Sequence, residues 1–191
     1  YALLAYQTAY LKANYPQHFM ASLLTIEAQN TDKLALYLGE CRDMNIPILP
    51  PDLNASAAGV KVTDDGVRFG LTAIKNVGEN AIASILGYRQ ETGTLKSLFT
   101  LCEEVDLRLA NKRVFESLIK AGALDSLLSV GPRSVARRRP QLLGLVDRAI
   151  EHGNRIQRDR ERGQTQLFDT VPQTEQPADG TQFREVAPWS D

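Results

Sequence analysis

The sequence has little of the residue types that build metal centres, disulfide scaffolds and membrane spans. Only two cysteines and two histidines occur in 191 residues: Cys41, Cys102, His18 and His152. Their spacing matches no metal-ligand pattern, so both cysteines are predicted to be free thiols of a reducing compartment. No apolar run approaches the length of a membrane-spanning helix. The residues before Asn14 have the pattern of an apolar helix rather than of a cleavable leader, which favours a piece of a longer protein.

Excess charge of one sign is also lacking, since the net charge is −1, but the charges are unevenly distributed. Residues 131–162 hold nine arginines against four acidic residues, whereas residues 163–191 hold five acidic residues against Arg184 alone. The first segment is predicted to be a basic linker with a long helix from about Pro140 to Glu161, whose charged last turns are solvated and play only a supporting electrostatic role. The second is predicted to be a flexible acidic tail.

Apolar periodicity predicts helices in the first third of the chain. Residues 1–14 carry a wide apolar band, which predicts a helix buried on most sides. Pro16 suits the first position of a second helix, and Asn30 suits the cap of a third helix that runs to Met44. Residues 45–52 contain three prolines and are predicted to be an extended connection. These helices have no catalytic pattern and are interpreted as scaffold.

A short β-hairpin is predicted next. Residues 60–63 and 67–69 alternate in polarity on either side of Asp64, Asp65 and Gly66. An Asp-Gly pair between two such runs is a strong hairpin signal. The two aspartates are therefore interpreted as turn formers rather than as a catalytic pair.

The stretch from Phe69 to Arg89 follows directly and predicts two short helices joined by a tight turn. Asn76 and Gly78 are the residue types that best tolerate a left-handed backbone. Such a turn leaves backbone N–H groups free at the start of the second helix, where the helix dipole is positive and favours a phosphate. The pattern resembles the helix-hairpin-helix motif, with Asn76 in place of the usual first glycine. The candidate DNA-binding residues of this turn are Lys75, Asn76, Val77, Gly78, Glu79 and Asn80.

A helix is predicted at residues 111–121, and its first turn contains two basic residues. Lys112 and Arg113 lie at its start, where cations oppose the helix dipole, so helix stability does not explain them and a nearby phosphate would. Two plainer alternatives stay open on the residues alone. The turn at Asn76 and Gly78 is equally compatible with an ordinary helical hairpin without a ligand, and Lys112 and Arg113 with solvated surface charge.

One apolar pair stands out within the acidic tail. Leu167 and Phe168 have no predicted core to join, and exposed pairs of this kind often anchor in a partner's pocket. The alternative is that they fold back onto the long helix.

Taken together, these segments resemble the C-terminal part of the bacterial DNA polymerase III alpha subunits, the replicative C-family polymerases. The resemblance covers essentially the whole chain and is carried by strings that occur in the same order. They are residues 1–16, 18–21, 40–42, 48–54, 73–78, 111–114, 117–123 and 163–168.

The resemblance implies a mainly α fold: a helical end of the fingers domain, then a helix-hairpin-helix domain with one short β-hairpin and a flexible C-terminal tail. The corresponding ranges are residues 1–56, 57–130, 131–162 for the basic linker and long helix, and 163–191 for the tail. Gln164, Leu167 and Phe168 match the anchoring positions of the family's peptide for the sliding clamp.

The implied function is to bind the backbone of double-stranded DNA and to tether a polymerase to the clamp, among other replicase subunits. The implied location is the bacterial cytoplasm at the nucleoid, with no membrane. The magnesium-binding carboxylates of the family lie in an upstream palm domain that this sequence does not match, so neither catalytic residues nor a cofactor are predicted here. An error-prone C-family polymerase and a structural helical module without DNA binding are the alternatives.

Overall fold

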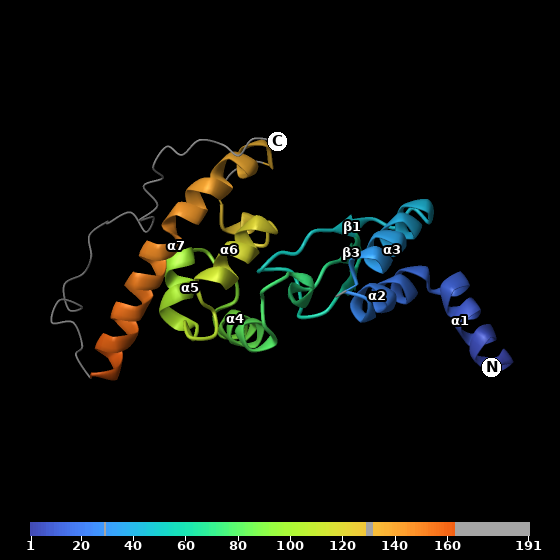
Figure 1. Ribbon diagram of the computed structural model, residues 1–191, viewed down its shortest axis with the longest axis horizontal. Helices are drawn as coiled ribbons and strands as arrows, with labels where there is room; N and C mark the ends of the chain where they lie inside the picture. The colour runs from blue at the N-terminus through green and yellow to red at the C-terminus, as the bar shows by residue number, and fades with distance from the viewer. Residues whose placement is uncertain (29, 129–131, 163–191) are drawn as a thin grey trace.

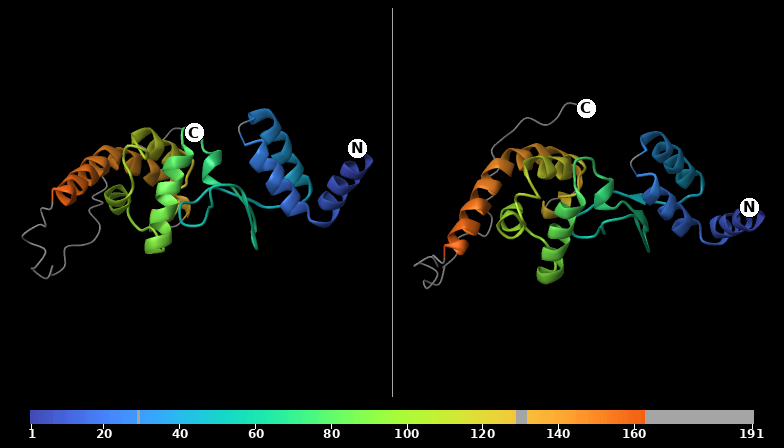
Figure 2. Two further views of the ribbon diagram at one scale, coloured as in Figure 1. Left: turned by 90° about the horizontal axis from the view of Figure 1, so that it is seen from below. Right: turned by 60° about the horizontal axis from the view of Figure 1, so that its bottom comes forward.

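The described part of the chain is elongated and mainly helical, as the computed structural model shows for residues 1–28, 30–128 and 132–162. The helices α1–α3 lie at one end, the helices α4–α7 at the other, and a small sheet lies between them (Figures 1 and 2). The elements are α1 (Ala2–Asn14), α2 (Pro16–Ile26), α3 (Thr31–Asp43), β1 (Ile48–Leu49), β2 (Lys61–Thr63), β3 (Gly66–Arg68), the 3-10 turn η1 (Leu71–Ala73), α4 (Glu79–Thr92), α5 (Leu98–Glu104), α6 (Lys112–Lys120), the 3-10 turn η2 (Asp125–Leu127) and α7 (Pro132–Glu161). The predicted fold class is confirmed.

The N-terminal helices form where their capping residues indicate. Pro16 occupies the first turn of α2, and the side chain of Asn30 accepts a hydrogen bond of 3.2 Å from the Lys33 amide at the start of α3. A small core joins α2 and α3 to the inner face of the sheet. Its buried members are Met20, Ala21, Leu24, Cys41, Ile46 and Val67.

The prediction that the first helix is buried on most sides is wrong for the described residues. No residue of α1 is buried, and the side chains of Leu3, Leu4 and Tyr6 are more than 60% exposed. The apolar band exists, but α1 contacts mainly α2, and Lys12 near its end pairs with Glu40 of α3. A sequence pattern reports which face is apolar and not what covers it.

The predicted β-hairpin is present, with one additional strand. Strands β2 and β3 pair antiparallel, with Val62 opposite Val67, and β1 adds a parallel partner that pairs Ile48 with Val67. The prolines around Ile48 and Leu49 leave only those two residues free to pair, so the predicted extended connection becomes a minimal edge strand. Gly66 is required at the turn, because its φ is +139° and a Cβ there would overlap the carbonyl of Pro47.

The larger core lies among α4–α7 and the turns between them. Phe115, Leu118 and Ile119 from α6 pack there with the inward face of α7, which contributes Leu142, Val146 and Ala149. The helix α7 begins at Pro132, and the prediction that it begins near Pro140 is wrong. Pro140 therefore lies inside the helix. A proline within a helix removes one backbone hydrogen bond, and packing of α7 on α5 and α6 offsets that loss.

Candidate nucleic-acid interface

The turn between η1 and α4 has a geometry that the sequence only partly indicated. The first predicted helix of the pair is a single 3-10 turn, closed by a bond from the Ile74 amide to the Leu71 carbonyl. Asn76 takes the left-handed conformation, with φ of +67°, whereas Gly78 is extended, with φ of −76° and ψ of 153°. The reversal of the chain therefore rests on Asn76 alone, and backbone strain does not explain Gly78.

The start of α4 is open. Gly78 is the N-cap residue and offers no side chain to accept from the first amides, which have no partner within the helix itself. A Cβ added at Gly78 would meet no heavy atom within 4 Å. Since the fold accepts a side chain there, the glycine leaves room for something that approaches the backbone from outside.

The turn is held rigidly from behind. Val77 is buried between the exposed residues Asn76 and Gly78. The amides of Leu71 and Thr72 donate to the carbonyls of Ala57 and Ala58, each at 3.0 Å. These contacts fix the direction of the open helix end.

Two polar side chains tie this region together across long sequence separations. The guanidinium of Arg89, near the end of α4, donates to the carbonyls of Leu53 and Ser56 at 2.6 and 2.7 Å. The amide of Asn54 bonds both the backbone N–H and the carbonyl of Leu95. Neither role could be predicted from the sequence, because neither spacing nor polarity marks partners that lie 33 to 41 residues away.

The turn lies beside α6. The side-chain amide of Asn76 donates to the Ser117 hydroxyl at 3.4 Å. Residues four apart lie on the same face of a helix, so Arg113 shares the face of Ser117. Lys75 and Arg113 are exposed and form no ion pair within the described residues. The structure therefore brings an open helix start and two unpaired cations into one region.

Lys112 has a different role from its neighbour. Its ammonium pairs with the Asp147 carboxylate of α7 at 2.7 Å, and this hydrogen bond raises the pKa of Lys112. The side chain of Asn111 caps α6 by accepting from the Val114 amide at 3.3 Å. Of the two predicted DNA-binding cations, Lys112 thus contacts α7, and Arg113 lies on the open surface.

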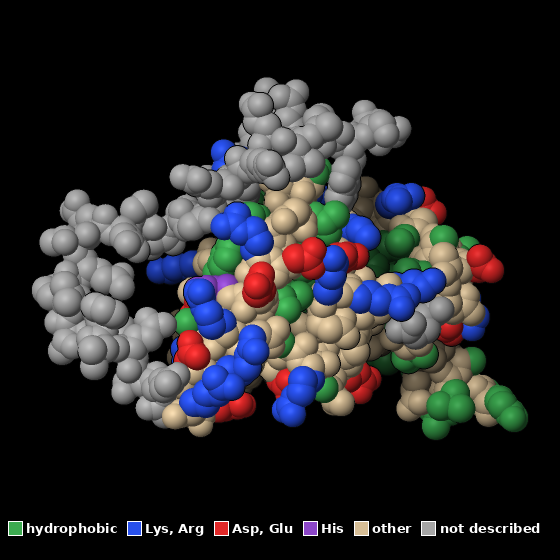
Figure 3. Space-filling view, turned by 60° about the vertical axis from the view of Figure 1, so that its left-hand side comes forward, with side chains coloured by type: hydrophobic (Ala, Val, Ile, Leu, Met, Phe, Trp, Pro, Cys, Tyr) green, Lys and Arg blue, Asp and Glu red, His purple; other side chains and the backbone are tan. Residues whose placement is uncertain are grey.

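The charged end of α7 is anchored rather than simply solvated. Figure 3 shows this face of the molecule, where basic and acidic side chains alternate over α5 and α7. The Gln157 side-chain amide donates to the carbonyls of Cys102, Glu103 and Val105, which closes the C-terminal end of α5. Arg160 pairs with Glu104 at 2.7 Å.

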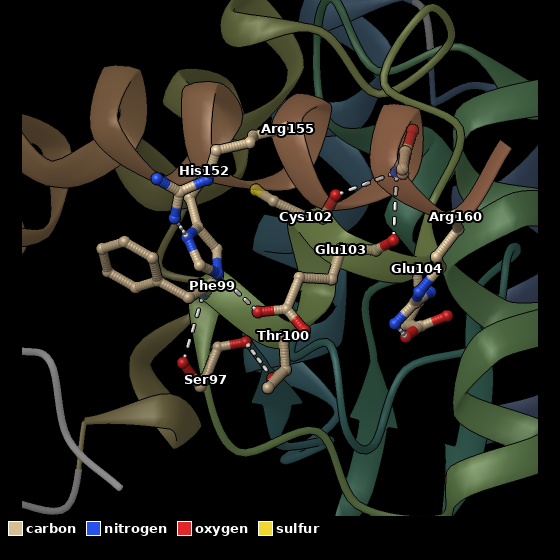
Figure 4. Close-up of polar contacts among 10 residues, drawn as sticks. Ser97, Phe99, Thr100, Cys102, Glu103, Glu104, His152, Arg155 and Arg160 are labelled. Carbon is tan, nitrogen blue, oxygen red and sulfur yellow. Dashed lines mark hydrogen bonds and ion pairs between the residues drawn. The ribbon is translucent and has the colours of Figure 1, made fainter. Parts of the chain in front are cut away.

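His152, which looked isolated in the sequence, has two polar neighbours in space. Its Nε2 lies 2.8 Å from the Glu103 carboxylate, and its Nδ1 lies 3.3 Å from a guanidinium nitrogen of Arg155 (Figure 4). Burial raises the pKa of the neighbouring Cys102 thiol to about 12, so this free cysteine is unreactive. Within the described residues, no group of three or more His, Cys, Asp or Glu side chains is placed to hold a metal ion. None of the helices described is long and apolar enough to cross a membrane.

The clamp-peptide residues Gln164, Leu167 and Phe168 lie outside the described residues. The Asp64 and Asp65 pair lies in the turn between β2 and β3, as predicted.

The chain matches a known motif and is similar to several known proteins. A model of the helix-hairpin-helix motif matches residues 45–135, the range from β1 to the start of α7. The DNA polymerase III alpha subunit of Thermus aquaticus is 44% identical over 177 residues, which cover 93% of this chain. That of Saccharopolyspora erythraea is 50% identical over 66% of the chain, and that of Vibrio cholerae 38% identical over 99%.

The chain belongs to the family of bacterial DNA polymerase III alpha subunits. It spans between 11% and 16% of the length of these three relatives. The helix-hairpin-helix match includes the open start of α4, the Asn76 turn and α6, so the region singled out by geometry lies within the region that the motif model recognises.

Proposed function

We propose that this chain is the part of a DNA polymerase III alpha subunit that binds the backbone of double-stranded DNA without reading its sequence, and that it also tethers the polymerase to the sliding clamp. The observation that carries the DNA half is the start of α4, which has no side-chain cap and has no heavy atom within 4 Å of the place where a Cβ of Gly78 would lie. A phosphate suits such a helix start.

The proposed contact is electrostatic and uses backbone groups. The amides of Gly78, Glu79 and Asn80 donate to phosphate oxygens, while Lys75 and Arg113 supply the positive charge and Asn76 and Val77 hold the turn in shape. Lys112 contributes only when it releases Asp147. With ~2–4 phosphates engaged, the slope of log affinity against log salt is about −0.9 per phosphate, which makes the contact weak at high salt.

The clamp half rests on the sequence string Gln164 to Phe168 and on the family. Leu167 and Phe168 insert into an apolar groove of the ring-shaped clamp, and Gln164 fixes the end of the peptide. Such a tether raises the local concentration of DNA without a tight protein–DNA bond, which supports processive synthesis. The magnesium-dependent chemistry and its carboxylates are proposed to lie in another part of the polymerase, which works in the bacterial cytoplasm with other replicase subunits.

Two other functions make different predictions. An error-prone polymerase of the same family shares the DNA contact, but the clean clamp peptide favours the main replicative form. A purely structural helical module shows no salt-dependent duplex binding at all.

The DNA half is tested by measuring duplex binding over a series of salt concentrations. Gly78→Val places a branched side chain over the open amides, and we expect a loss of affinity that is equal for duplexes of unrelated sequence. Gly87→Val is the matched control, because Gly87 lies in the same helix and a Cβ there also meets no heavy atom within 4 Å. Equal affinities for the two variants would reject the turn as a phosphate site.

The clamp half is tested by retention of the chain on immobilised sliding clamp. The variant Leu167→Ala/Phe168→Ala should lose retention, while Gly87→Val should keep it. Retention of the double variant at the level of the unmodified chain would reject the clamp assignment without affecting the DNA half.

A further inference from the structure

A second basic site lies on α7, on the face that packs beside α5. It is a hollow of about 410 Å³ between the two helices. Its lining residues are Phe99 from α5 and Arg148, Glu151, His152, Arg155 and Arg158 from α7. Three guanidinium groups thus share a small volume with a single carboxylate.

The arginines of this hollow differ from Arg139 and Arg160 of the same helix. Arg139 pairs with Asp125 and Arg160 with Glu104, so both hold α7 to the rest of the body. Arg148 and Arg155 have no carboxylate partner within the described part of the chain, and Arg158 donates only to the Asn154 carbonyl at 3.0 Å. The three arginines are exposed and line the same hollow. Helix stability does not account for them, because like charges on one helix face are destabilising.

One of these arginines is positioned by its neighbours. A guanidinium nitrogen of Arg155 lies 3.3 Å from His152 Nδ1, and Nε2 of the same ring lies 2.8 Å from the Glu103 carboxylate. Phe99 contacts the imidazole edge-on, with ring centroids 5.7 Å apart and planes at 71°. Figure 4 shows Arg155 and Glu103 on either side of His152, with Phe99 beside the ring. A chain of contacts that begins in α5 therefore holds Arg155 at the hollow.

We propose that this hollow binds the phosphodiester backbone of DNA, as a second contact separate from the turn at Asn76 and Gly78. The planar guanidinium pairs with phosphate oxygens through two parallel hydrogen bonds. Arg148 and Arg155 lie seven residues apart on one face, or about 10 Å along the helix, so they reach different phosphates of one strand. A strand with one charge on every nucleotide satisfies all three arginines at once, whereas one isolated anion does not.

The test uses the full 191-residue chain and a duplex of arbitrary sequence, with affinity measured over a series of salt concentrations. In Arg148→Gln/Arg155→Gln, the slope of log affinity against log salt should become shallower by about 1.8, at 0.9 for each lost phosphate. The control Arg42→Gln/Lys61→Gln also removes two exposed cations, from α3 and β2, and should leave the slope unchanged. Circular dichroism checks that both variants keep their helix content.

Two results would overturn the inference. One is a slope that changes equally in the two double variants, which would assign the effect to net charge alone. The other is a loss of binding to poly-glutamate with unchanged duplex binding, which would assign the hollow to an acidic protein partner. Gly78→Val measured alongside separates this inference from the proposed function. If only the arginine variant weakens duplex binding, DNA binding at the hollow is supported and phosphate binding at the turn is rejected. If only Gly78→Val weakens it, DNA binding at the hollow is rejected.

Discussion

Two helix starts in the same body, those of α4 and α6, are built in opposite ways. At α6, the Asn111 side chain accepts from the Val114 amide, and Lys112 is paired with Asp147. At α4, Gly78 leaves the amides open, and Lys75 beside the turn forms no ion pair within the described residues. A helix start that is capped from within needs no ligand, and one that is left open in a rigid frame can accept an anion. The start of α6 therefore has a structural role, whereas the start of α4 is a candidate binding site.

The largest expected effect comes from disturbing the packing of α7, which lies against α5 and against α6. In Gly153→Val, the side chain would overlap the carbonyl of Cys102, where α7 crosses the end of α5. Overpacking of this kind typically lowers the free energy of unfolding by about 1–3 kcal/mol, and backbone contact places this change at the upper end. Chemical denaturation measures it. Gly144→Val in the same helix meets no atom within 4 Å and is the control, and equal losses in both variants would contradict the role given to Gly153.

The next effect concerns the capped helix start. Asn111→Ala removes the acceptor for the Val114 amide and should lower the free energy of unfolding by about 1 kcal/mol. Duplex affinity should stay the same under conditions where the chain remains folded, because this helix start is not proposed to bind phosphate. A clear loss of duplex affinity in folded Asn111→Ala would remove the distinction between the two helix starts.

The smallest effect concerns the acidic residue at the open start. Glu79 is exposed in the first turn of α4, where it interacts favourably with the helix dipole but repels a phosphate. Glu79→Gln should raise duplex affinity by up to about fivefold, since a charge at this position is worth roughly 0.3–1 kcal/mol. Glu91→Gln, at the other end of α4, removes the same charge and should change affinity less. A fall in affinity for Glu79→Gln would contradict the proposed position of the phosphate.

The sequence predicted local features well where a residue acts on its immediate neighbours. Pro16, Asn30 and Asn111 start helices as expected, and Asn76 takes the left-handed conformation that the turn requires. These outcomes follow from backbone preferences and from hydrogen bonds that span three residues or fewer.

Predictions from the sequence were wrong or incomplete where the structure of a segment depends on what packs against it. The exposure of α1, the short strand β1 and the continuation of α7 through Pro140 are all decided by tertiary contacts or their absence. The same holds for His152, whose partner Glu103 is 49 residues away, and for Gln157 at the end of α5. The family resemblance supplied the clamp residues, which stay a prediction.

The most direct test of the central claim is to convert the open helix start into a capped one. In Gly78→Asp, the carboxylate can accept from the first amides of α4, as Asn111 does at α6, and the extended backbone at Gly78 allows it. We predict that the free energy of unfolding rises, by up to about 1 kcal/mol, while duplex affinity falls about tenfold or more. Opposite signs for stability and affinity in one variant indicate that the open amides serve a ligand. Unchanged duplex affinity in a more stable Gly78→Asp chain would contradict the account.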